Sequence, residues 1–177
     1  MPNIIGGKYK KTTLDVPSKL VRPTSAFKRE AIFSILESYA IKHSIEIYKN
    51  KSIIDIFAGS GLVGLEAISR GIEKAYFIEN NDDIAKILEK NCQKICKKNE
   101  FEIITGKAIN SLEEKFIIEP SIIFIDPPYK ENKINIVIDK ILKNKLLKNC
   151  GLIIIHRHKD DDVMINNSLN ILDQRYY

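Results

Sequence analysis

The segment around Asp126 contains residues that could do chemistry. An apolar run over residues 122–125 ends in Asp126-Pro127-Pro128-Tyr129. Two consecutive prolines lack N–H donors and stiffen the backbone, so carbonyl groups stay free to point at a substrate. Asp126 and the Pro127 carbonyl offer two acceptors for one exocyclic amino group, and the Tyr129 ring can stack on a planar base. We therefore predict a catalytic site formed by Asp126, Pro127, Pro128 and Tyr129.

Such a site suits methyl transfer to an aromatic amine. The amine is a poor nucleophile because its lone pair is delocalised into the ring. Two acceptors that pull on its hydrogens favour a pyramidal nitrogen, which can attack a methyl group in line. The reaction requires neither a metal nor a strong base, since the methylated nitrogen loses its proton easily. The alternative is a strand followed by a rigid turn without chemistry.

A second motif indicates a nucleotide-like cofactor. Gly59, Gly61 and Gly64 fit the pattern G-x-G-x-x-G directly after a strand-like run, and Glu79 follows twenty positions after the first glycine. Glycines allow a tight turn and close approach of a ligand, and a carboxylate at this spacing can bind both ribose hydroxyls. Together these features predict an adenosine-containing cofactor, the alternative being a tight turn with no ligand.

Asp55 decides which cofactor is expected. It lies near the end of the first strand-like run, where the pyrophosphate of a dinucleotide would lie, and a carboxylate would repel phosphate. S-adenosylmethionine instead carries an ammonium and a sulfonium and no phosphate. The chain is also too short for the second domain that most NAD-dependent dehydrogenases carry.

A parallel sheet covered by helices would position these motifs, because Ile-rich runs alternate with amphipathic stretches. The expected strands are Ser52–Phe57, Ala75–Glu79, Phe101–Thr105, Ile122–Asp126 and Gly151–His156. The helices expected between them are Gly61–Arg70, with Gly71 as its stop, Asp82–Lys98 and Asn132–Leu147. Ahead of the sheet we expect a short hairpin of Ile4–Lys10 with Thr12–Val16, and a helix over Thr24–Ala40 whose apolar face holds Ala31, Ile32, Ile35, Leu36 and Tyr39.

Basic residues are concentrated at the N-terminus. Residues 1–29 contain seven Lys or Arg against Asp15 alone, while the whole chain carries a net charge of +5. Abundant lysine explains the total but not its position, so we predict a polyanionic partner. Residues 1–42 are expected to form a basic arm packed on a catalytic domain of residues 43–177, and the candidate contacts to nucleic acid are Lys8, Lys10, Lys11, Arg22 and Arg29.

Composition restricts the class of protein. The chain has 177 residues, 44% hydrophobic and 29% charged, which suits one globular unit. Its three cysteines form no metal-like pair, and no run is apolar enough for a membrane span or a signal peptide. We therefore expect a cytoplasmic protein without a metal or membrane partner, and a monomer.

The motifs together resemble a family. Asp-Ile-Phe-Ala-Gly-Ser-Gly with Asp-Pro-Pro-Tyr looks like the class I amino-methyltransferases, which have a Rossmann-like fold. The segments IIGGKYK at residue 4, RPTS at residue 22, REAIF at residue 29 and GLEAISRG at residue 64 are similar to the RsmD-type methyltransferases of 16S ribosomal RNA. The resemblance covers roughly residues 3–155. It implies methylation of N2 of a guanine, nominally guanine 966, in naked RNA or in the assembled small subunit.

Carried over position by position, the resemblance also implies roles in cofactor binding. Glu79, with Asn80 beside it, would hold the ribose, and Lys107 and Ala108 would lie beside the adenine. Many class I relatives have Asp or Asn where Lys107 stands, and a backbone N–H of Ala108 could serve in place of that side chain. Arg22 and Thr24 would close the pocket. The cofactor loop would consist of Asp55, Phe57, Ala58, Gly59, Ser60 and Gly61.

Two alternatives remain open at this point. A DNA adenine-N6 methyltransferase shares the Asp-Pro-Pro-Tyr motif, but no stretch here is long enough for a target-recognition insertion. A non-catalytic RNA-binding protein could retain the fold, although intact Asp126, Pro127 and Tyr129 argue against it. A methyl-transfer assay on RNA separates the alternatives.

Overall fold

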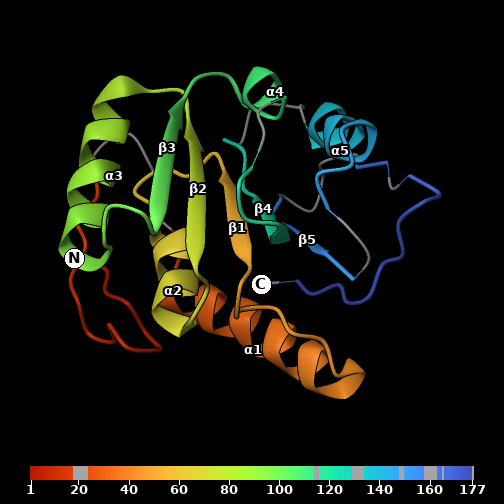
Figure 1. The fold of residues 1–177 in the computed structure, drawn as a ribbon, viewed down its shortest axis with the longest axis horizontal. Helices are drawn as coiled ribbons and strands as arrows, with labels where there is room; N and C mark the ends of the chain where they lie inside the picture. Colours follow the sequence, from red (N-terminus) through yellow and green to blue (C-terminus); the bar gives the residue numbers. More distant parts are fainter. Residues whose placement is uncertain are drawn as a thin grey trace.

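A five-stranded parallel sheet forms the centre of the molecule (Figure 1). The computed structural model describes residues 1–17, 24–113, 116–128, 134–147, 150–157, 163–164 and 166–176. The strand order is β3-β2-β1-β4-β5, and every neighbouring pair is parallel. The strands are β1 Ser52–Ile56, β2 Lys74–Glu79, β3 Phe101–Thr105, β4 Pro120–Ile125 and β5 Leu152–Ile155. Each predicted strand end lies within two residues of the observed end, and the predicted parallel sheet flanked by helices is confirmed.

Helices cover both faces of the sheet (Figure 1). They are α1 Ala26–His43, α2 Leu62–Arg70, α3 Asp82–Ile95, α4 Ala108–Ser111 and α5 Ile134–Lys143. One core cluster joins α1, α2 and α3 to strand residues such as Ile53, and the other joins α4 and α5 to Ile54 and Ile56. Successive strand residues point to opposite faces, so an uninterrupted Ile-rich strand fills both clusters.

Helix α1 buries a face that overlaps the predicted one in part. Its buried side chains are Arg29, Phe33, Leu36 and Ala40. Of the predicted face, Leu36 is buried, while Ile32 and Tyr39 are half-buried and pack against the same core cluster. The prediction omitted Phe33, whose ring lies 4.8 Å below the Arg70 guanidinium of α2.

The predicted N-terminal hairpin forms only in part. The two segments meet at one isolated antiparallel bridge, Asn3 to Thr13, and the Ile4 N–H donates to the Thr12 carbonyl at 2.9 Å. Between them Gly7 has a φ of +72°, which turns the chain out of an extended conformation. The Lys8 N–H then donates to the Ser69 carbonyl of α2 at 2.7 Å. The ends of the loop therefore bond to each other, while its middle bonds to a helix and forms no strand.

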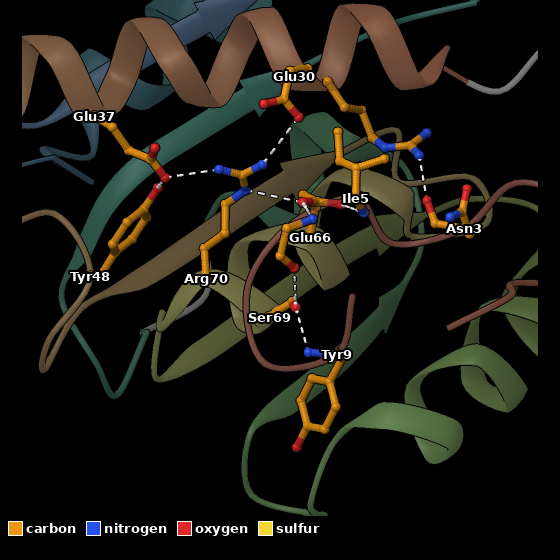
Figure 2. A network of polar contacts seen from close by, with 11 residues as sticks. Asn3, Ile5, Tyr9, Glu30, Glu37, Tyr48, Glu66, Ser69 and Arg70 are labelled. Carbon is orange, nitrogen blue, oxygen red and sulfur yellow. Dashed lines mark hydrogen bonds and ion pairs between the residues drawn. The ribbon is translucent and has the colours of Figure 1, made fainter. Parts of the chain in front are cut away.

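A polar network centred on Glu66 and Arg70 of α2 holds this loop and α1 in place (Figure 2). The fully buried Glu66 carboxylate accepts from the Ile5 N–H at 2.9 Å, the Gly6 N–H at 2.8 Å and Arg70 Nε at 3.0 Å. Arg70 also pairs with Glu37 of α1 at 3.0 Å. Three segments that are distant in sequence are thus joined through two side chains.

Helix α4 was not predicted, because four residues are too few for a helical period to be visible. It follows β3 and packs its buried Ala108 beneath the second core cluster. Within the described residues, no helix is both long and apolar enough to cross a membrane.

Candidate active site

Three acidic residues lie at the carboxyl edge of the sheet. Asp55 lies on β1, Glu79 ends β2, and Asp126 directly follows β4. Because β1 pairs in parallel with both β2 and β4, these positions share one edge. Ligands of open α/β sheets bind at this edge. In the described part of the chain, no three or more His, Cys, Asp or Glu side chains are grouped to hold a metal ion.

The glycine loop after β1 is bonded to the end of β2. Phe57 and Gly59 have positive φ angles of 63° and 56°, so the chain turns sharply. The Ala58 N–H donates to the Ile78 carbonyl at 3.0 Å, and the Gly59 N–H donates to Glu79 Oε2 at 2.9 Å. These bonds hold the loop beside the Glu79 carboxylate, where the sequence motif requires it.

Gly61 and Gly64 are required by packing before any ligand is considered. A Cβ at Gly61 would overlap the Leu88 side chain of α3, and one at Gly64 would overlap the Phe77 ring of β2. Gly61 also has a φ of +80°. The structure therefore revises the expected reason for these glycines, because they allow α2 to approach the sheet and α3 closely.

Backbone donors fix the Glu79 carboxylate at the end of β2. Besides the bond from Gly59, Oε1 accepts from the N–H groups of Asn80 and Asn81 at 2.9 Å each. The Glu79 side chain is buried, while Asn80 beside it is exposed. A carboxylate held in this way is oriented in advance, as ribose binding would require, and that role stays a prediction.

Asp55 is a buried acid without a cationic partner among the described residues. It is 2% exposed and accepts one hydrogen bond, from the Gly64 N–H at 2.9 Å. Burial raises its pKa well above the ordinary value, and the negative charges of Asp126 and Glu79 raise it further. The Gly64 bond opposes this shift only in part. A cationic ligand would relieve the cost, so this site fits the ammonium and sulfonium of S-adenosylmethionine.

Asp126 is held by two side chains from distant parts of the chain. Thr24 Oγ1 donates to Asp126 Oδ2 at 3.1 Å, and His156 Nδ1 lies 3.0 Å from Asp126 Oδ1. Pro127 is half-buried and Pro128 is exposed. The carboxylate thus stands at the site with both oxygens oriented and with a proline backbone directly after it.

Comparison with known proteins decides the family. The family model described as "Conserved hypothetical protein 95" matches residues 2–177. Ribosomal RNA small subunit methyltransferase D of Haemophilus influenzae is 30% identical, over 97% of this chain and 86% of that protein. This chain belongs to the RsmD-type methyltransferase family. An uncharacterized methylase of Rickettsia prowazekii is also 30% identical, over 100% of this chain and 94% of that protein.

A solved structure agrees with this RsmD-type assignment. The crystal structure of a Haemophilus influenzae protein named "putative methylase" superposes with a TM-score of 0.78 at 27% identity. The match covers 99% of this chain and 92% of that one. The similarity therefore includes the N-terminal segment as well as the sheet.

Several residues predicted for the site of this RsmD-type protein have defined places. Thr24, expected to close the cofactor pocket, donates to Asp126. Lys107 is exposed, and Ala108 begins α4, so the Ala108 N–H has no partner within that helix. Arg22 and Tyr129 lie outside the described residues. Ser60 is buried, and its carbonyl accepts from Asn91 Nδ2 of α3 at 3.0 Å.

The prediction that Arg29 contacts nucleic acid is wrong. Its side chain has no exposed surface, and its guanidinium donates to the carbonyl groups of Thr24 at 2.6 Å and Asn3 at 2.7 Å. Burial lowers the pKa of Arg29, and the charge of Glu66 opposes that shift. Arg29 therefore connects the start of α1 to the N-terminal loop inside the protein.

The three loop lysines are exposed, but Lys8 is not beside the site. It lines a surface cavity with residues that precede the strands, including Asn50 before β1, Glu73 before β2 and Ile118 before β4. This is the amino edge of the sheet, opposite the edge that carries Asp126. A contact of Lys8 with nucleic acid would therefore be separate from the target base.

Sequence analysis assigned no role to His156 or Lys28. The rule that ligands bind at strand ends indicates that His156 could line the pocket, since it follows the fifth predicted strand, and the structure places it directly after β5, which neighbours β4. Lys28 gave no such signal, because its approach to His156 depends on where α1 packs.

Proposed function

We propose that this protein transfers a methyl group from S-adenosylmethionine to the exocyclic N2 of a guanine in 16S ribosomal RNA. The observation that carries the proposal is the oriented Asp126 carboxylate, followed by Pro127, on the strand adjacent to the glycine loop and Asp55. Relatives named ribosomal RNA small subunit methyltransferase D support the choice of ribosomal RNA.

The cofactor would lie across the ends of β1 and β2 and supply a methyl group bound to a sulfonium. Asp55 would face its positive charges, and Glu79 would accept from its ribose hydroxyls. The loop of Phe57, Ala58 and Gly59 would lie alongside the cofactor. Further contacts would come from Ser60, Gly61, Asn80, Lys107 and Ala108, with Arg22 and Thr24 closing the pocket.

The chain's own residues would prepare the nitrogen. Asp126 and the Pro127 carbonyl would each accept a hydrogen bond from the guanine NH2, which favours a lone pair directed at the methyl group. The bound S-adenosylmethionine would supply the methyl group and leave as a neutral thioether, and the methylated nitrogen would release one proton to solvent water. Pro128 would stiffen this acceptor pair, and Tyr129 would stack on the base.

The target and setting follow from the same proposal. We propose guanine 966 as the base, 16S RNA as the substrate, either naked or in the assembled small subunit, and a cytoplasmic monomer. Lys8, Lys10 and Lys11 would contact the RNA backbone from the N-terminal arm, which would pack on the catalytic domain without a metal or membrane partner.

The substitution Asp126→Asn tests the reaction. An amide presents a donor where the substrate NH2 needs an acceptor, and His156 and Thr24 compete for its one remaining oxygen. We expect turnover on 16S RNA to fall by about 10²–10³-fold, with S-adenosylmethionine affinity nearly unchanged. Transfer of a labelled methyl group, followed by mass mapping of methylguanine, measures the first quantity, and calorimetry measures the second. Turnover near the wild-type value would overturn the assignment of Asp126.

A further inference from the structure

A chain of hydrogen bonds leads from α1 to the proposed catalytic carboxylate. Lys28 Nζ lies 2.9 Å from His156 Nε2, and His156 Nδ1 lies 3.0 Å from Asp126 Oδ1. The His156 N–H donates to the Ile125 carbonyl at 2.9 Å, which places the imidazole beside the end of β4. The side chains of Asp126 and His156 are each 27% exposed, so the chain borders the open site.

The chemistry of these groups determines where the imidazole proton lies. A lysine ammonium can only donate, so His156 Nε2 must accept. The neutral ring then carries its hydrogen on Nδ1 and donates it to Asp126. Thr24 donates to the other oxygen of the same carboxylate. Lys28 and Thr24, both at the start of α1, therefore act on one carboxylate, Lys28 through His156.

We infer that Lys28 and His156 are positioning residues, which select the Nδ1–H tautomer and hold Asp126 as an oriented acceptor for the substrate amine. The inference rests on the proposed function and adds two residues to it. With the hydrogen on Nε2, the Nδ1 lone pair would face the carboxylate and repel it. Asp126 would then turn away from the ring, and the amine would lose an oriented acceptor.

Two substitutions at His156 separate positioning from simple support of the fold. In His156→Asn the side-chain NH2 can occupy the place of Nδ1–H and still donate to Asp126. In His156→Gln the longer side chain reaches the place of Nε2, so it keeps a partner for Lys28 but loses the donor to Asp126. Both replace a ring by an amide of similar polarity, which makes each the control for the other.

The expected results differ between the variants. We expect kcat on 16S RNA to fall by about 10- to 100-fold in His156→Gln, since a hydrogen bond to a charged group is removed, and by less than about threefold in His156→Asn. Lys28→Met should lower kcat by about three- to tenfold. Cofactor affinity and melting temperature should stay close to wild type in all three. Equal losses of kcat in the Asn and Gln variants would overturn the inference, because a purely structural role of His156 predicts equal losses and a positioning role does not.

A second measurement does not depend on turnover. The ¹⁵N chemical shifts of the imidazole, assigned with the His156→Asn protein, report which nitrogen carries hydrogen. We expect the Nδ1–H tautomer in the wild-type protein and a mixture in Lys28→Met. An Nε2–H ring in the wild-type protein would overturn the inference. If the wild-type protein transferred no methyl group to 16S RNA, the proposed function would be overturned instead. The ¹⁵N shifts would still show whether the hydrogen-bond chain from Lys28 to Asp126 exists.

Discussion

Two clusters of acidic side chains differ in how their charges are balanced. In the cluster around α2, Arg70 forms ion pairs with Glu66 and Glu37 at 3.0 Å each and with Glu30 at 3.6 Å. At the carboxyl edge of the sheet, Asp55 and Glu79 have no Lys or Arg partner among the described residues. The acidic charges of the first cluster are therefore balanced within the protein, whereas those of Asp55 and Glu79 are not.

The pKa shifts follow this difference. Burial by itself would lower the pKa of Arg70, but hydrogen bonds to Glu37 and Glu66 raise it above its ordinary value. Burial raises the pKa of Asp55, and its acidic neighbours add to the shift. A buried charge with an internal partner stabilises the fold, whereas a buried acid that lacks one is suited to a cation from outside. The contrast separates a structural network from a binding site.

Removal of Glu66 should have the largest effect on stability. Glu66→Ala removes a fully buried carboxylate and leaves the half-buried Ile5 and Gly6 N–H groups and Arg70 Nε without their partner. We expect the free energy of unfolding to fall by about 3–5 kcal/mol. Denaturant unfolding measures it, and Glu73→Ala, at an exposed acid after α2, should change it by less than about 0.5 kcal/mol. Similar small losses in both variants would remove the distinction between the clusters.

The substitution Asp55→Asn should act in the opposite direction on stability. The amide oxygen can still accept from the Gly64 N–H, and the cost of a buried charge disappears. We expect the ligand-free protein to melt at a higher temperature, by roughly 2–4 °C for each 1 kcal/mol gained. S-adenosylmethionine should bind more weakly in calorimetry, because its positive charges lose a partner. A lower melting temperature together with unchanged affinity would contradict the assignment of Asp55.

The unfolding free energies of the wild-type protein and Asp55→Asn should differ more as pH rises. The folded-state pKa of Asp55 lies above its value of 3.8 in the unfolded chain, so the wild-type protein loses stability as pH rises through the folded-state pKa. Asp55→Asn lacks this loss. The difference in unfolding free energy should therefore grow in favour of the variant as pH rises above 3.8, and then level off. A difference independent of pH would show that Asp55 is not the titrating group.

The lysines of the N-terminal loop should give the smallest effect, because they are exposed. Replacing Lys8, Lys10 and Lys11 by Ala should weaken RNA binding and reduce the log–log salt slope by about one unit for each phosphate that the loop no longer neutralises. Cofactor affinity should not change. Filter binding at several salt concentrations measures the slope, and replacement of the same residues by Arg should preserve it. An unchanged slope in the Ala variant would remove the loop from the RNA interface.

The strands and the glycine loop could be predicted because their signals are local. A continuous Ile-rich run is typical of a strand buried on both faces, and Gly71 after a helical stretch predicts the helix end that the structure shows. The order of the parallel strands then brings Asp55, Glu79 and Asp126 to one edge. Local pattern and general topology together thus predicted where the site lies.

Other features depend on partners that are distant along the chain. Arg29 has the appearance of an exposed basic residue until the carbonyl groups of Asn3 and Thr24 surround it. The N-terminal loop pairs only at its ends, because Glu66 and Ser69 accept from N–H groups in its middle. In both cases long-range hydrogen bonds fix a conformation that the local pattern did not predict.

The sequence by itself determined the sheet, the turn after β1 and the acidic edge, because hydrophobic burial, glycine conformation and strand direction act over a few residues. Only the tertiary structure decided that Thr24 and His156 meet Asp126 and that Lys28 meets His156, although these residues are about 30 to 130 residues apart along the chain. The physical reason is that a hydrogen bond depends on distance and direction in space, which the packing of α1 against the sheet establishes.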